Sequence, residues 1–167
     1  MSDLIRQLGP LAGATRFRRI SEKLYADGDK IYRNAGIAFK ATWFPVYYLL
    51  STTEGELTVT QIADKIGFTH ITVKNVLREL QREGLVTVIA NPKDGRSKLA
   101  RLSRKGKNRL RQLEPLWVQF SQVLKSIFDE AHPEVITILD NIDVALEAKP
   151  ISERIQEITT ETNNLTR

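Results

Sequence analysis

The stretch TVTQIADKIGFTHITVKNVLRELQREG, residues 58–84, decides the fold. Thr58 followed by Gln61 is the pattern of a capping box, in which each side chain bonds the backbone N–H of the other residue. Gly67 is a natural helix end, and Thr69 is a suitable cap for the helix that follows. The stretch therefore predicts two helices joined by a tight turn.

The second of these helices has one apolar and one polar face and should end at Gly84. We expect five apolar side chains to point inward: Ile71, Val73, Val76, Leu77 and Leu80. We expect the polar side chains to point toward solvent or a ligand: His70, Thr72, Lys74, Asn75 and Arg78.

Two short runs after this helix indicate a β-hairpin. Residues 85–90, LVTVIA, are rich in β-branched side chains, and residues 97–102, SKLARL, form a second run. The intervening NPKDGR contains the Pro and Asp-Gly that turns favour. Two helices followed by a hairpin predict a winged helix-turn-helix.

The hairpin and the start of the next helix are strongly basic. Seven of the seventeen residues 91–107 are Lys or Arg, and only Asp94 is acidic. Residues 57–113 carry 13 basic and 4 acidic side chains, whereas residues 114–167 carry 4 and 10. Such segregation of charge indicates a surface that meets a polyanion, although a solvated surface is the alternative.

The flanking segments predict further helices. One should begin at Gly9-Pro10 and end at Gly36, and a second should run from Trp43 to Leu50 with Thr42 as its cap. Ser103 should cap a long helix with an apolar seam, and Pro115 should kink that helix or release one backbone bond. The seam residues are Leu110, Leu113, Trp117, Phe120, Leu124 and Ile127.

Two shorter helices should follow. One begins at Pro133, with Val135, Leu139, Ile142 and Leu146 on one side. The last begins after Pro150, carries Ile151, Ile155 and Ile158, and frays in the ending TTETNNLTR.

The predicted fold is mainly α, with a small β-hairpin wing and additional N- and C-terminal dimerisation helices. We expect three segments: N-terminal dimerisation and linker helices at 1–56, a DNA-binding lobe at 57–102 and C-terminal dimerisation helices at 103–167. The seam and the three isoleucines indicate a partner surface, with intramolecular packing as the alternative.

Composition excludes several classes of protein. There is no cysteine, so disulfides and thiol chemistry are excluded, and His70 and His132 alone make a metal site improbable. No apolar run approaches the roughly 20 residues that span a bilayer. The first residues lack the order of a signal peptide, so we expect a cytoplasmic protein without a cofactor.

The sequence resembles the MarR family of bacterial transcription regulators over nearly its whole length. The wing carries the most specific part of the resemblance: Asp-x-Arg at 94–96, then a Leu-Ser-x-x-Gly entry into the next helix at 102–106. The segments LGPLAGATRFRR and GIAFKATWFPVYYLL resemble a subgroup also found fused to acetyltransferase modules. No Gly-rich acyl-CoA loop is visible in the sequence.

The resemblance implies a homodimer that binds double-stranded DNA, most often as a repressor. From the residues themselves, helix 69–83 is the expected major-groove reader, with Asn75 and Arg78 facing bases and His70, Thr72 and Lys74 facing bases or phosphates. On the wing, Arg96 should enter a minor groove. Lys93, Lys98 and Arg101 should meet phosphates, and the resemblance pairs Asp94 with Arg96.

A dimer related by a two-fold axis would select a palindromic operator. The resemblance also implies release by a small aromatic or acidic ligand near the junction of the dimer helices and the winged lobe. The candidate ligand residues are Phe17, Arg18, Tyr25, Trp43, Phe44, Tyr47 and Tyr48. The alternative is a plain aromatic core.

Two other functions remain open. The protein could be a ligand-independent, architectural DNA-binding protein, or the regulatory remnant of an acetyltransferase-type enzyme. No nucleophile–base pair, phosphate-binding loop or metal cluster in the sequence supports catalysis, so we expect no enzymatic activity.

Overall fold

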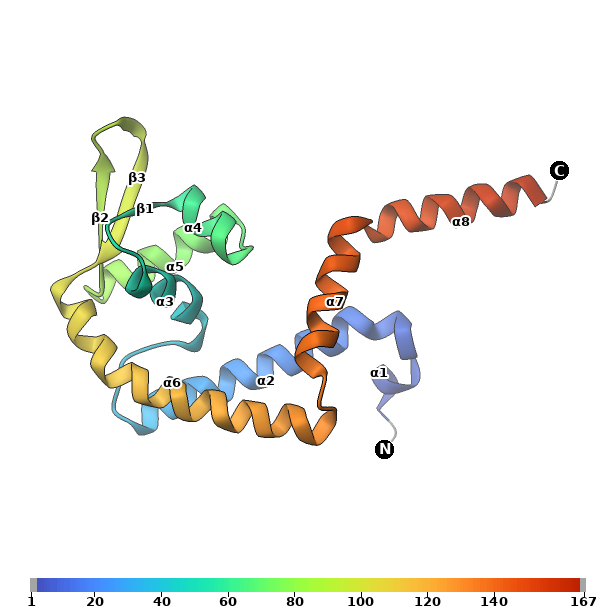
Figure 1. The fold of residues 1–167 in the computed structure, drawn as a ribbon, viewed down its shortest axis with the longest axis horizontal. Coiled ribbons are helices and arrows are strands. Elements are labelled where there is room, and N and C mark those ends of the chain that lie inside the picture. Colours follow the sequence, from blue (N-terminus) through green and yellow to red (C-terminus); the bar gives the residue numbers. More distant parts are fainter. Residues whose placement is uncertain (1–2, 166–167) are drawn as a thin grey trace. The chain divides into compact units, whose positions relative to one another are not determined.

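Helices make up most of the chain, and one small sheet lies among them (Figure 1). The structure is a computed structural model that describes residues 3–165. The chain divides into two compact units, Met1–Val118 and Gln119–Arg167, here called the N-terminal unit and the C-terminal unit. The prediction of a mainly α fold with a winged helix-turn-helix is confirmed.

The N-terminal unit contains most of the elements. In chain order they are α1 (Leu4–Gln7), the 3-10 helix η1 (Gly9–Ala12), α2 (Gly13–Asn34), the 3-10 helix η2 (Ala41–Trp43), α3 (Phe44–Thr52), β1 (Leu57–Thr58), α4 (Val59–Ile66), α5 (His70–Arg82), β2 (Val86–Asn91) and β3 (Asp94–Leu102). Helix α6 (Arg104–Ala131) begins in this unit and ends in the C-terminal unit, which also holds α7 (Val135–Ala148) and α8 (Ile151–Leu165).

The predicted helix-turn-helix forms through the predicted caps. The Gln61 backbone N–H donates to Thr58 Oγ1 at 3.1 Å, and the Thr58 N–H donates to Gln61 Oε1 at 2.8 Å. Gly67 ends α4 with a φ of 68°, a conformation that glycine adopts at low cost. Thr69 then caps α5 by accepting a bond from the Thr72 N–H. Local sequence therefore specifies both helices and their turn.

The sheet has three strands in the order β1-β3-β2, all antiparallel. Strands β2 and β3 form the predicted hairpin, which projects beyond the helices of the N-terminal unit (Figure 1). Strand β1 was not predicted, because its two residues look like the entry to α4. Leu57 pairs with Ala100, so the base of the wing is tied to the start of the helix-turn-helix.

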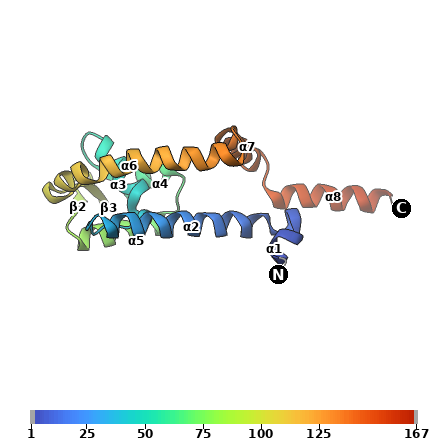
Figure 2. The ribbon, with the colours of Figure 1, turned by 90° about the horizontal axis from the view of Figure 1, so that it is seen from below.

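Apolar side chains from the helices and the sheet form one core in the N-terminal unit. Its most completely buried large side chains are Val46, Tyr47, Ile62, Val73, Leu80, Leu85 and Leu113. The end of α2 and the stretch of α6 just before Val118 lie side by side (Figure 2), and the Trp117 Nε1–H of α6 donates to the Tyr32 hydroxyl of α2 at 2.9 Å. Helix α6 continues through Pro115 without interruption.

The N-terminus differs from the prediction. The predicted start at Gly9-Pro10 is helical, but it is the separate 3-10 helix η1, and α2 begins only at Gly13. The capping role of Thr42 was also wrong: it lies inside η2, and α3 begins at Phe44 without a side-chain cap.

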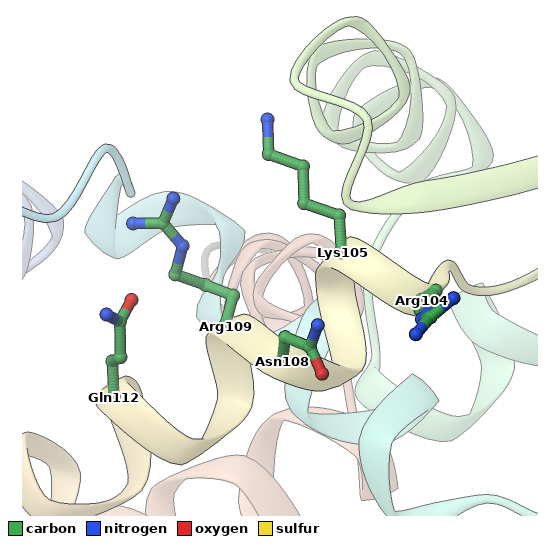
Figure 3. A pocket seen from close by; sticks show the side chains of 5 residues that line it. All are labelled: Arg104, Lys105, Asn108, Arg109 and Gln112. Carbon is green, nitrogen blue, oxygen red and sulfur yellow. The ribbon is translucent and has the colours of Figure 1, made fainter.

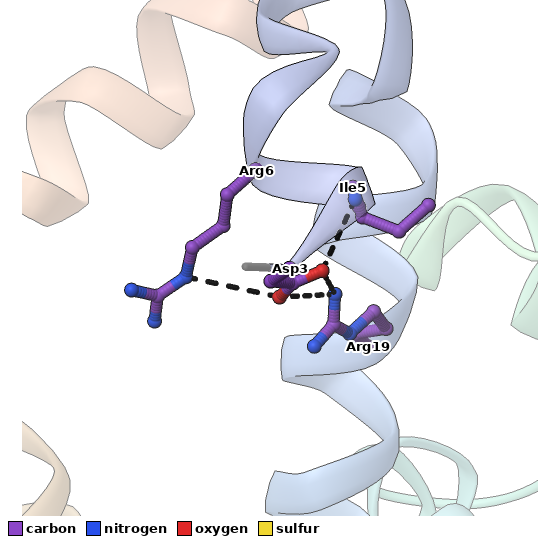
Figure 4. A network of polar contacts seen from close by, with 4 residues as sticks. All are labelled: Asp3, Ile5, Arg6 and Arg19. Atoms are coloured by element: carbon purple, nitrogen blue, oxygen red, sulfur yellow. Dashed lines mark hydrogen bonds and ion pairs between the residues drawn. The ribbon is translucent and has the colours of Figure 1, made fainter. Parts of the chain in front are cut away.

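An ion pair joins α1 to α2 (Figure 4). Arg19 Nη1 donates to both carboxylate oxygens of Asp3 at 2.9 and 3.1 Å, and Asp3 also accepts a bond from the Ile5 backbone N–H. The guanidinium of Arg19 is the largest factor that lowers the pKa of Asp3. This ion pair therefore links the cap of the short first helix to α2.

The C-terminal unit exposes apolar side chains on α7 and α8. Ile151, Ile155 and Ile158 are all more than half exposed. The predicted fraying of residues 159–167 was wrong for the part that the structure describes, because α8 is helical to Leu165. The last two residues of the predicted frayed segment, 166–167, lie outside the described residues.

The return of the wing into α6 is a very close backbone approach. A Cβ placed on Gly106 would overlap the Leu85 carbonyl oxygen and lie 3.2 Å from the carbonyl carbon. The Tyr47 hydroxyl donates to the Gly106 carbonyl at 2.6 Å, and burial raises the pKa of Tyr47 to about 12. Only glycine fits at position 106.

We predict that Gly106→Ala destabilises the protein by about 3 kcal/mol or more, because a backbone atom blocks the added methyl group. Urea denaturation of the variant and its parent measures the difference. Gly95→Ala is the matched control, since nothing lies within 4 Å of its added Cβ. An equal loss of stability in both variants would contradict the structural role of the close backbone approach at Gly106.

Candidate nucleic-acid interface

The outward face of α5 carries the predicted reader side chains. His70, Thr72, Lys74, Asn75 and Arg78 are all exposed, as predicted. Arg78 Nη1 donates to Asn75 Oδ1 at 3.3 Å, which aligns the two expected base readers on one side of the helix. Val73, Val76, Leu77 and Leu80 are buried against the core.

Ile71 departs from the prediction. It is 73% exposed rather than buried, because it lies two residues before Val73 and therefore points away from the core. The error arose from assigning every apolar residue of the helix to one face.

Hydrogen bonds within residues 91–97 fix the wing tip. The Lys93 N–H donates to Asn91 Oδ1 at 3.0 Å, and the Asn91 side-chain amide donates to Ser97 Oγ at 2.8 Å. Asp94 Oδ1 accepts from the backbone N–H of Arg96 at 3.1 Å. In the described part of the chain, Asp94 thus orders the backbone at Arg96 and forms no ion pair with the guanidinium.

The four basic side chains expected on the wing, Lys93, Arg96, Lys98 and Arg101, are exposed. Arg101 Nε lies 3.5 Å from Glu56 Oε1, so its charge is partly neutralised within the protein. Lys98 has no carboxylate partner among residues 3–165. The wing therefore presents at least three cations that are available to an anionic partner.

The basic surface continues onto the first turns of α6. Five side chains of this helix border an open cavity of about 420 Å³: Arg104, Lys105, Asn108, Arg109 and Gln112 (Figure 3). Lys105 Nζ donates to the Glu83 carbonyl oxygen at 2.7 Å, which satisfies an acceptor at the end of α5. This contact supports the position of α5, and Lys105 is not a free cation.

A contact that the sequence did not reveal holds α5 from its other side. Glu79 accepts a bond from the Trp43 indole N–H at 2.8 Å and from Lys40 Nζ at 2.7 Å. The Lys40 bond is the largest factor that lowers the pKa of Glu79, followed by the Trp43 bond. Periodicity gave no signal for this link, because Lys40 and Glu79 lie 39 residues apart.

The predicted ligand residues divide into two groups. Trp43, Phe44, Tyr47 and Tyr48 belong to an aromatic cluster with Tyr32, Phe39 and Trp117, with ring centroids 5.0 to 6.3 Å apart. Trp43 and Tyr47 are buried and hydrogen-bonded. Phe17, Arg18 and Tyr25 lie on α2, exposed or nearly so, and Arg18 pairs with Glu22 at 2.8 Å. These three side chains therefore stand apart from the aromatic cluster.

An exposed polar helix and a basic hairpin on one small lobe define a winged helix-turn-helix, a class of DNA-binding protein. A sequence model of the MarR family matches residues 39–97. This match to the winged lobe agrees with the family resemblance found in the sequence. No curated protein matches the chain.

Solved structures support the same fold. The M. tuberculosis transcriptional regulator MosR in complex with DNA is 28% identical, with a TM-score of 0.66 over 81% of this chain and 96% of that chain. The S. aureus MepR–DNA complex is 22% identical, with a TM-score of 0.65 over 81% and 96%. PcaV from Streptomyces coelicolor, with its natural ligand, is 23% identical, with a TM-score of 0.64 over 89% and 97%.

MosR, at 28% identity, is described as a transcriptional regulator, which supports the prediction of no enzymatic activity. No helix within residues 3–165 is long and apolar enough to cross a membrane. In the same residues, no group of three or more His, Cys, Asp or Glu side chains is arranged to hold a metal ion.

We predict that Glu79→Gln lowers stability at pH 7 by about 1 kcal/mol, because a partly exposed ionic hydrogen bond is removed. The folded-state pKa of Glu79 is below its ordinary value of 4.5, so this stability is present above that value. It is lost as the pH falls through the lowered value. Urea denaturation at pH 7 and pH 3 should therefore show a smaller difference in stability between variant and parent at pH 3 than at pH 7. An equal difference at both pH values would contradict the ionic role.

Proposed function

We propose that this protein is a homodimeric transcription regulator that binds a palindromic DNA operator and represses the adjacent gene. The observation that carries the proposal is the joint exposure of the polar face of α5 and the basic wing on one lobe. The DNA complex of MosR, at 28% identity, supports this partner. Footprinting on the promoter of its own gene tests the proposal directly.

The two elements would contact DNA in different ways. Helix α5 is long enough to enter a major groove, where Asn75 and Arg78 have the donors and acceptors that distinguish adenine and guanine. The wing would lie beside it, with Arg96 in the minor groove and Lys93 and Lys98 at phosphates. Arg101 would contribute less, because Glu56 already faces it.

Exposed apolar side chains support the proposed dimer. In the N-terminal unit they include Leu4, Leu8, Leu11, Phe17 and Ile20, and in the C-terminal unit they include Ile136, Val144, Ile151, Ile155 and Ile158. Apolar groups exposed in this number indicate a surface that is covered in the working protein. The proposed segments 1–56 and 103–167 supply that dimer surface, and 57–102 the DNA contacts. A two-fold axis would set two α5 helices about one DNA turn apart.

The proposal includes control by an effector. A small aromatic or acidic ligand would bind the protein and release it from DNA. The outer edge of the aromatic cluster, at Phe44 and Tyr48, is partly exposed. PcaV, which has the same fold, was solved with its natural ligand. The subgroup resemblance to acetyltransferase fusions stays a prediction.

A ligand-independent regulator is the second candidate, and one observation favours it. Trp43 and Tyr47 are buried among other rings and hydrogen-bonded, so neither presents a free face to a ligand. Thermal shift with a panel of small aromatic acids separates the two candidates, because a bound effector raises the melting temperature.

We predict that Arg96→Ala weakens operator binding, while fold and assembly stay unchanged because the side chain is exposed at the wing tip. Fluorescence anisotropy with the footprinted duplex measures the affinity. Operator binding equal to that of the parent would show that Arg96 does not contact DNA.

We predict that parent binding depends steeply on salt. If the dimer neutralises about eight phosphates, the slope of log K against log salt is about −7. Lys98→Ala should make that slope shallower by about 2, since each subunit then neutralises one phosphate fewer. Arg101→Ala should change the slope less than Lys98→Ala does, because Glu56 already neutralises part of the Arg101 charge. Asn75→Ala is the control, which should relax sequence preference and leave the slope nearly unchanged. A parent slope near zero would contradict DNA binding by this surface.

We predict that the double variant Ile155→Asp, Ile158→Asp separates the subunits, because charge is costly at a buried apolar surface. Analytical ultracentrifugation at micromolar concentration measures the change. Glu157→Gln, on the same helix, is the control and should remain dimeric. A monomeric parent would contradict the dimer, and a dimeric double variant would exclude α8 from the interface.

A further inference from the structure

One apolar side chain of the reading helix has no place in the core. Ile71 is 73% exposed, whereas Val73, Val76, Leu77 and Leu80 of the same helix are buried. An isoleucine in the first turn of a helix forgoes favourable burial if only water covers it. Its position therefore needs an explanation.

Helix geometry places Ile71 at the centre of the outward face. At about 100° per residue, positions 71, 75, 78 and 82 fall within a stripe of roughly 60°. This stripe lies opposite the buried side chains. Its members are Ile71, Asn75, Arg78 and Arg82, all exposed.

Several neighbours of Ile71 on and just before α5 are polar. The neighbouring hydroxyls of Thr69 and Thr72 lie 2.9 Å apart and bond to each other. Asn75 and Arg78 follow on the stripe and are joined by their own hydrogen bond. Ile71 is the only large apolar side chain of α5 that is exposed, so this helix does not present the broad apolar patch that protein partners require.

The major groove offers one apolar feature that suits such a side chain. Thymine presents a C5-methyl group there, beside the polar base edges that Asn and Arg recognise. Residues in the first turns of a recognition helix are those that reach base edges. Ile71 lies in the first turn of α5.

We infer that Ile71 contacts the C5-methyl group of a thymine in each half of the operator and so determines specificity at that base pair. The inference rests on the proposed function, and it adds a specificity residue to the polar ones. Removal of the methyl group should weaken binding, because the isoleucine then has no apolar group to cover it.

The test uses deoxyuridine, which lacks only this methyl group. The parent protein selects duplexes from a random pool, and each thymine of the selected duplex is then replaced singly by deoxyuridine. One thymine per half-site should show a loss of about four-fold, the equivalent of burying one CH₂-sized group. Replacement of this thymine in both half-sites should weaken binding by about fifteen-fold.

The same probes are measured with Ile71→Ala. Its affinity for thymine and deoxyuridine at that position should be equal, while its melting temperature matches that of the parent, because the side chain is exposed. Ile89→Ala is the matched control: this isoleucine is 40% exposed on β2 of the wing, and the minor groove carries no thymine methyl group. The control should keep the parent's discrimination.

The possible results distinguish a failure of the Ile71 contact from a failure of the proposed function. A parent that selects a sequence but shows no loss with deoxyuridine, or a variant that keeps the loss, overturns the role of Ile71 and leaves the regulator intact. A parent that selects no sequence overturns the proposed function, and the inference with it.

Discussion

The contact between Gly106 and Leu85 sets the geometry on which the winged lobe depends. The absence of a Cβ at position 106 lets the first turn of α6 rest on the backbone that leaves α5. Around this point, Ser103 donates through its N–H to the Leu85 carbonyl and through its hydroxyl to the Gly84 carbonyl. Tyr47 bonds Gly106 from α3. Three helices and the hairpin are thereby fixed at one junction.

Helix α5 is held at both of its sides by groups from distant parts of the chain. Lys105 satisfies the Glu83 carbonyl at its end, and Glu79 receives bonds from Lys40 and Trp43. The indole of Trp43 also packs on Phe39, which contacts Trp117 of α6. A change at Trp43 would therefore reach α5 through the Glu79 carboxylate as well as through the shared apolar core. The proposed effector control would have a physical route through these contacts.

Local signals in the sequence were sufficient for the helix-turn-helix and the hairpin. The capping box at Thr58, the turn at Gly67 and the Pro and Asp-Gly of the wing act within a few residues, so their outcome can be read from the chain. The remaining features depend on long-range packing: strand β1 forms only because β3 lies beside it, and the Glu79 link joins residues far apart. The orientation of Ile71 could be read from helical angles but was obscured by its apolar character. The roles of the interface residues depend on a partner and stay predictions.

The bonds that shape the wing tip close within residues 91–97 and involve no other part of the described chain. The tip is therefore a self-contained module carried on a two-stranded stem. Such a module can change its length or charge during evolution while the core stays intact, since no buried side chain depends on it. It also meets its target already ordered, so little conformational entropy is lost on binding. Diversity of targets in proteins built this way can arise at the tip with little effect on folding stability.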